Sequence, residues 1–240
     1  MLHARAGLIL SLGCWLKVYM ARKRNYIQEI LNINWRMHRR GSRWEKFSRR
    51  LTPLLNARDA LDNSKIDLKQ KQELYRYFPI AMIAAMEGYF KIVYRQLIDY
   101  GQPYSANALG FKDLKFEIAE LLAISGGIVS SGQLVAHLLP HKSIYDINRN
   151  MSTLLGEDFF GEFKKQKIPF IEDDILIEEI FPYLKGGVQS TFEIRHLFCH
   201  ELGTKVRPSI KHINEMFEMS GWFVLFTEIY LENTFDKAAT

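Results

Sequence analysis

The spacing of apolar residues after Leu68 restricts the possible folds of this chain more than any other feature. Within residues 80–97, apolar side chains recur mostly at steps of three and four: Ile80, Ile83, Ala84, Phe90, Val93 and Leu97. This spacing places them on one face of a helix, and no later stretch alternates apolar and polar residues as a half-buried strand does. The sequence therefore predicts an all-α fold, a bundle of amphipathic helices joined by short turns.

Proline and glycine residues mark where several of the expected helices begin and end. Pro79 fits the first turn of a long helix, and Gly101 follows its last residue. A short extended segment is expected around Pro169, because proline does not fit a helix interior. Further helices are predicted over residues 114–124, over residues 131–137, as a short pair within 148–165, and from Pro208 to about Tyr230.

A break is expected in the helical segment that precedes the last helix. An amphipathic helix is predicted over residues 173–181, and Pro182 with the Gly186–Gly187 pair interrupts the chain after it. Ser190 and Glu193 then have the spacing of a capping box, in which both side chains accept hydrogen bonds from backbone amides at a helix start. A new helix is therefore predicted from Ser190 to about residue 202.

Charge is distributed unevenly along the chain, whose formal net charge is +5. Residues 1–60 contain 13 Lys and Arg residues against 3 Asp and Glu residues, whereas the remainder is net acidic. We therefore expect a basic helical N-terminal extension over residues 1–60, a polar joint around residues 56–65, and a helical domain over residues 61–240.

Basic side chains in the extension are candidates for binding RNA. They surround Trp44 and Phe47, so the stretch combines cations that neutralise phosphates with rings that stack on bases. The solvated face of an amphipathic helix explains the same pattern equally well. The RNA-binding candidates are Arg39, Arg40, Arg43, Lys46, Arg49 and Arg50.

Cysteine content and apolar runs favour a soluble protein of the cytoplasm. The two cysteines, Cys14 and Cys199, are too few for a disulfide framework and fit a reducing compartment. The longest apolar run, residues 6–16, is shorter than the about 20 residues that a membrane-spanning helix needs. No membrane association is expected.

One short motif carries the candidate chemistry. Residues 195–200 read Arg-His-Leu-Phe-Cys-His, in which a polar residue directly follows the arginine and a histidine comes five positions after it. This pattern resembles the R-x4-6-H motif of the HEPN superfamily of helical-bundle ribonucleases. The stretch 78–90, with Glu87 among small and apolar residues, resembles the early helix of that superfamily. The similarity covers roughly residues 70–233.

The resemblance implies cleavage of RNA without a metal ion or another cofactor. His200 is the expected base, because a neutral imidazole can take the proton of a ribose 2′-hydroxyl, and the product is then a 2′,3′-cyclic phosphate. Arg195 is the expected clamp on the attacked phosphate. His196, about 40° from His200 around a helix, is the candidate acid or phosphate ligand. Glu87 is expected to orient Arg195 or a histidine.

The resemblance also implies partners. Members of the superfamily generally pair two motif helices across a dimer axis, so we expect a homodimer with a composite active site. Members act in prokaryotic toxin–antitoxin and phage-defence systems, often beside a nucleotidyltransferase-like protein. An antitoxin or such a protein is therefore the further partner expected.

Two other functions are consistent with the same residues. His196 and His200 have the spacing of two metal ligands on one helical face, with Cys199 nearby, which would make the chain a metal-site protein. Alternatively, the bundle binds RNA or a partner protein without catalysis, since helical bundles are reused as scaffolds. A protein that only binds would keep its binding activity after His200→Ala.

Overall fold

The computed structural model describes residues 24–37, 42–168, 174–200 and 208–238. These residues form helices and contain no strand, which confirms the all-α prediction. The long helices are α2 (Tyr26–Met37), α3 (Arg43–Asp62), α5 (Tyr77–Tyr100), α9 (Ile144–Leu155), α11 (Ile177–His200) and α12 (Ile210–Ala238). Shorter elements are α4 (Leu68–Tyr75), α6 (Tyr104–Asn107), η1 (Ala108–Gly110), α7 (Ile118–Ser125), α8 (Ser131–Leu138) and α10 (Phe159–Lys164).

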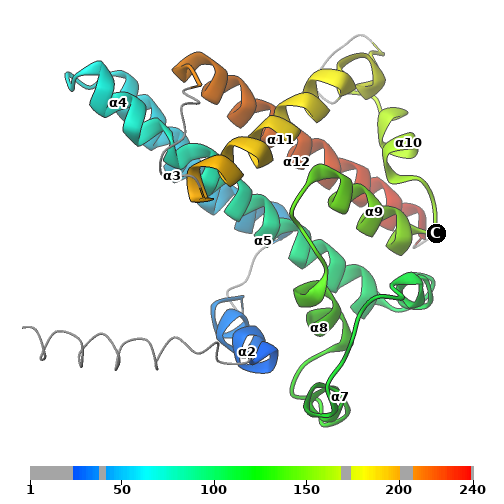
Figure 1. The fold of residues 1–240 in the computed structure, drawn as a ribbon. Helices are drawn as coiled ribbons and strands as arrows, with labels where there is room; N and C mark the ends of the chain where they lie inside the picture. Colours follow the sequence, from blue (N-terminus) through cyan, green and yellow to red (C-terminus); the bar gives the residue numbers. More distant parts are fainter. Residues whose placement is uncertain (1–23, 38–41, 169–173, 201–207, 239–240) are drawn as a thin grey trace, which may run out of the picture.

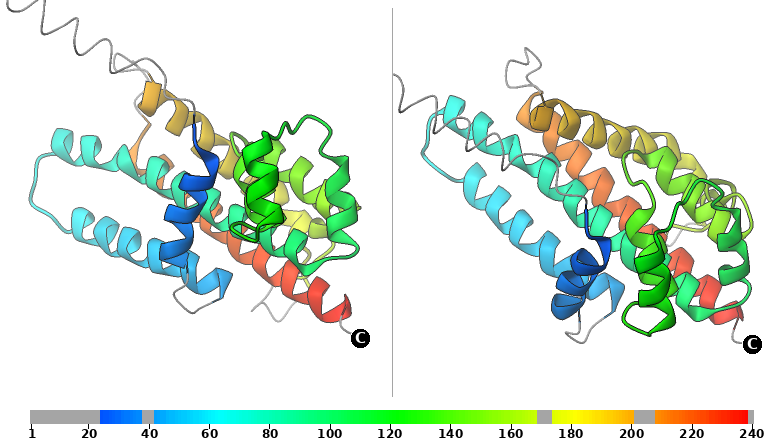
Figure 2. Two further views of the ribbon diagram at one scale, coloured as in Figure 1. Left: turned by 90° about the horizontal axis from the view of Figure 1, so that it is seen from below. Right: turned by 60° about the horizontal axis from the view of Figure 1, so that its bottom comes forward.

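Helix α5 is the centre of the bundle. It contacts α3, α8, α11 and α12, and it contributes buried side chains such as Phe90 and Val93 to the main core. Figure 2 shows α3, α5 and α12 side by side, and α11 packs against α5 and α12. Pro79 lies in the first turn of α5, and Gly101 ends the helix with a φ of 102°, in the region that glycine adopts without strain. Both predicted limits of this helix are confirmed.

Helix α11 is continuous, so the predicted break and the new start at Ser190 are wrong. Pro182 lies in the second turn and removes a single backbone donor. A Cβ atom at Gly187 would lie less than 3.0 Å from the side chain of Met219 on α12. Glycine at this position therefore allows two helices to pack closely and does not end one. Glu193 accepts a hydrogen bond from Gln189 Nε2 at 2.8 Å, not from a helix-start amide.

The basic helix α3 packs into the bundle, and the predicted boundary between residues 60 and 61 lies inside it. Phe47 is 2% exposed within the main core, and its ring centroid lies 5.8 Å from that of Tyr89 on α5. The polar joint expected around residues 56–65 is helical as far as Asp62. The basic residues that suggested a separate extension lie mainly on the solvent-facing side of α3. Apolar residues on its other side pack against the domain.

Several other limits differ from the prediction by a few residues. The short helix α7 begins at Ile118 rather than residue 114, after a capping box of Glu117 and Glu120, and α8 is capped by Ser130. The predicted pair of short helices is present as α9 and α10, and α12 continues beyond Tyr230 to Ala238. Lys167 pairs with Leu176 in an isolated bridge, whereas Pro169 lies outside the described residues. Within the described ranges, no helix is long and apolar enough to cross a membrane.

Candidate functional site

The structure brings Arg195 and Glu87 together. Arg195 lies on α11 and Glu87 on α5, and the distance between Arg195 Nη2 and Glu87 Oε1 is 3.9 Å. The two side chains are 35% and 30% exposed, so a ligand in solvent can reach both. At this separation the carboxylate attracts the guanidinium without a hydrogen bond between them and leaves most of its five N–H donors for other acceptors.

The histidines of the motif lie at the end of α11. His196 is exposed and immediately follows Arg195, and His200 is the last residue of the helix. The His200 side chain lies outside the described part of the structure, as do residues 201–207. Because α11 is helical through His200, the backbone positions of Arg195 and His200 are about 140° apart around the helix axis. A long arginine side chain is needed for both groups to reach one phosphate.

Arg76 is a basic residue near the candidate site that the sequence interpretation missed. Its guanidinium lies over the ring of Phe198, 5.3 Å from the ring centroid, and it pairs with Glu73 at 3.0 Å. Arg76 joins α4 to α5, so its contact with α11 depends on tertiary packing. No local pattern in the sequence would have predicted this contact.

The six RNA-binding candidates are in different environments. Arg39 and Arg40 lie outside the described residues. Arg43 points inward, where its Nε lies 3.0 Å from an oxygen of Glu228 and both side chains are nearly buried. Phe47 is buried, so its ring is not accessible for stacking on bases, whereas Trp44 is partly buried and packs against the core.

Lys46, Arg49 and Arg50 line a cavity of about 600 Å³ between α2, α3, α5 and α8. Lys91 and Arg95 of α5 also line it, and the one carboxylate among its lining residues is Glu87. The cavity is therefore basic, and it adjoins the Arg195–Glu87 pair. The four-residue spacing of Glu87, Lys91 and Arg95 places them on one helical face, a signal that the sequence contains.

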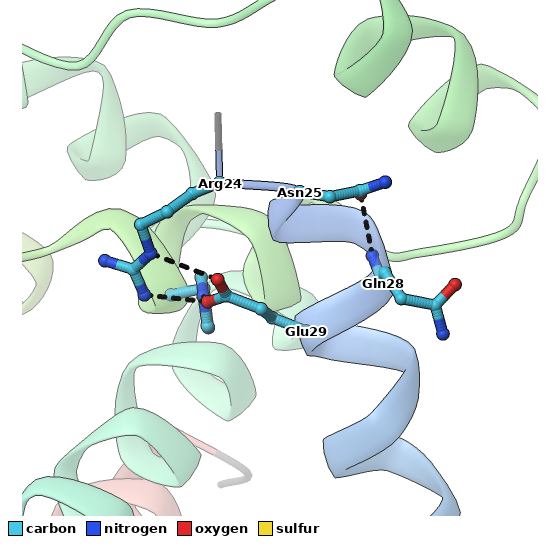
Figure 3. Close-up of polar contacts among 5 residues, drawn as sticks. Arg24, Asn25, Gln28 and Glu29 are labelled. Carbon is cyan, nitrogen blue, oxygen red and sulfur yellow. Dashed lines mark hydrogen bonds and ion pairs between the residues drawn. The ribbon is translucent and has the colours of Figure 1, made fainter. Parts of the chain in front are cut away.

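Helix α2 closes one side of this cavity and is fastened by charged groups. Glu29 Oε2 lies 2.7 Å from Arg24 Nη2 and 2.7 Å from His137 Nε2 on α8. Figure 3 shows Arg24 and Glu29 facing each other at the start of α2. The Arg24 hydrogen bond, aided by His137, lowers the pKa of Glu29 to about 2. Burial lowers the pKa of His137, although Glu29 opposes this shift.

Among the described residues, no three His, Cys, Asp or Glu side chains lie close enough to hold a metal ion. His196 and Cys199 therefore have no third ligand in that part of the chain, while the side chain of His200 and residue Glu201 lie outside it.

No family model, curated protein or solved structure matches this chain. The fold and site define the class of the protein as an all-α helical bundle with a basic cavity beside an Arg–Glu pair.

Proposed function

We propose that the protein is a metal-independent endoribonuclease whose active site is built on Arg195, His200 and Glu87. The observation that supports this proposal is the pairing of Arg195 with Glu87 across two helices, beside a cavity lined by basic residues. The two residues are separated by more than a hundred positions in the chain, and both are candidate active-site residues by the resemblance to HEPN ribonucleases.

Each residue has a role that fits cleavage by a ribose 2′-hydroxyl. Arg195 donates to the phosphate as it gains negative charge, while Glu87 limits the orientations of the guanidinium. His200 takes the 2′-hydroxyl proton as the 5′-oxygen leaves and a 2′,3′-cyclic phosphate forms. The leaving oxygen needs a proton from a second group. His196, or His200 of the partner subunit in a homodimer, supplies it.

RNA approaches this site along exposed cations of α3. Arg49 and Arg50 are exposed and line the mouth of the cavity that Glu87 also lines. Phosphates held there are attracted without regard to sequence, and the attraction weakens with salt. A role in a toxin–antitoxin or phage-defence system, with an antitoxin or a nucleotidyltransferase-like partner, rests on the resemblance alone.

The test is cleavage of a labelled mixed-sequence RNA in EDTA by the full chain. Arg195→Ala is expected to lower the rate by about 10²–10³-fold, as for loss of one transition-state donor. His200→Ala is expected to lower it by about 10²–10⁴-fold, as for loss of a general base. Arg149→Ala and His212→Ala are matched controls, because both side chains are exposed and neither lines the cavity.

Cleavage by the wild type and both controls, with 2′,3′-cyclic ends, is the expected result. Equal cleavage by all five proteins would place the activity elsewhere. No cleavage by the folded wild type would refute the proposal in favour of a bundle that only binds. For the homodimer, mixing Arg195→Ala with His200→Ala subunits is expected to restore part of the activity, because each subunit then supplies the group that the other lacks.

A further inference from the structure

The basic cavity has an inner end that the proposed active site does not use. Helices α3 and α5 run antiparallel. Near the start of α3, Arg43 contacts Gln96 at 3.0 Å, and one turn later Phe47 contacts Tyr89, which comes earlier in α5. This arrangement places Lys46 roughly level with Lys91, and Arg50 roughly level with Glu87. Lys46 and Lys91 therefore lie near each other at this end, one helical turn from Glu87, the one carboxylate among the lining residues.

These two lysines are available to a ligand. Both are half-buried, and neither forms an ion pair within the part of the chain that the structure describes. Arg95, one turn beyond Lys91, pairs with Asp99 at 3.4 Å and adds a further cation to this end. The lining as a whole contains five Lys and Arg residues against one carboxylate, and such an excess of positive charge favours an anion with more than one negative charge.

Apolar residues form much of the remaining lining of the cavity. Ile33 of α2 and Ile92 and Ala84 of α5 line it, and a Cβ atom at Gly88 would meet nothing within 4 Å. The space exists because α5 presents Ala84 and Gly88, which carry little or no side chain, where larger residues would fill it. A volume of about 600 Å³ is within the usual range of sites for small molecules.

We infer that this cavity binds a small phosphorylated molecule with a flat or apolar body, the chemistry of a nucleotide. Its phosphates lie between Lys46 and Lys91, and its body lies against Ala84, Gly88 and Ile92. Helix α2, fastened through Glu29 and His137, forms the opposite wall. The inference does not depend on RNA cleavage, because neither Arg195 nor His200 belongs to this site.

The test is calorimetric titration of the full chain with ADP in EDTA, with adenosine, tripolyphosphate and a short single-stranded RNA as further probes. The double variant Lys46→Gln/Lys91→Gln is expected to raise the Kd for ADP at least about tenfold, because it removes charge-assisted hydrogen bonds. Gly88→Met is expected to abolish binding by filling the cavity, while its higher helix propensity preserves the fold.

Two control variants separate the possible results. Lys112→Gln/Lys115→Gln removes the same charge from an exposed loop away from the cavity and is expected to leave the Kd unchanged. His200→Ala is expected to bind ADP normally whether or not the wild type cleaves RNA, so failure of one proposal is distinguishable from failure of the other.

Three results would overturn the inference. The first is that the wild type does not bind ADP. The second is that the wild type and the Gly88→Met variant bind ADP equally well. The third is that the wild type binds RNA or tripolyphosphate but not ADP. Circular dichroism and thermal melting of every variant establish that a lost signal is a lost site and not a lost fold.

Discussion

The pair of Arg43 and Glu228 provides the strongest test of the view that α3 belongs to the bundle. Arg43 Nε lies 3.0 Å from Glu228 Oε2, and the side chains are 12% and 5% exposed. Tyr89 also donates its hydroxyl to this carboxylate at 2.6 Å. Arg43→Met keeps the length of the side chain but removes its charge, so the Glu228 carboxylate remains buried without a cation.

Removing one partner of a buried ion pair typically costs about 3–5 kcal/mol of unfolding free energy. Because the Tyr89 hydrogen bond survives the substitution, we expect a loss near the lower end, about 3 kcal/mol. Glu228→Gln in the Arg43→Met background is expected to recover part of this loss, because an amide is less costly to bury than an unpaired carboxylate. Urea unfolding followed by circular dichroism measures each free energy.

Arg50→Met is the matched control for this experiment. Arg50 lies two turns further along α3, is exposed, and forms no ion pair among the described residues, so its replacement is expected to change stability by no more than about 0.5 kcal/mol. If Arg43→Met cost no more than Arg50→Met at an unchanged m-value, Arg43 would not be a buried anchor. It would then regain its place among the RNA-binding candidates.

Two further predictions follow from helix packing and from the fastening of α2. Gly187→Ala is expected to lower the free energy of unfolding in urea by about 1–3 kcal/mol, because the new methyl group collides with Met219. Gly186→Ala is the control: its methyl group meets nothing within 4 Å, so it should raise the free energy of unfolding by about 0.5–1 kcal/mol. Equal effects of the two substitutions would refute the close approach of α11 and α12. The folded-state pKa of Glu29 is about 2 and lies below its unfolded value near 4.3, so its contribution to stability is present above about pH 5 and is lost as the pH falls toward 2. The stability difference between wild type and Glu29→Gln should therefore shrink over that range, while a constant difference would contradict the pairing with Arg24 and His137.

Local patterns were sufficient for the fold class and for the limits of the central helix. The apolar spacing of residues 80–97 predicted α5, because a helix presents every third or fourth residue to the same neighbour. Pro79 and Gly101 act through their own backbone chemistry, so their effect does not depend on distant residues. The resemblance of residues 78–90 and 195–200 to one superfamily also indicated Glu87 and Arg195, whose side chains lie 3.9 Å apart in the structure.

The sequence interpretation failed where contacts between distant residues decide the outcome. A Gly–Gly pair such as Gly186–Gly187 is typical of a helix break. In the structure, however, Gly187 packs closely against Met219 on α12, and α11 continues through it. From the sequence, Arg43 was predicted to be a surface cation. It instead pairs inside the bundle with Glu228, which is 185 positions away in the chain and therefore could not be identified as its partner from local patterns.

The amino-acid sequence by itself therefore determined that the chain forms amphipathic helices and which types of side chain are available to a site. Only the tertiary structure decided which basic residues anchor the core, which line the cavity, and that Arg195 meets Glu87. The physical reason is that helix formation depends on neighbours within a few residues, whereas ion pairs and cavities depend on how whole helices pack.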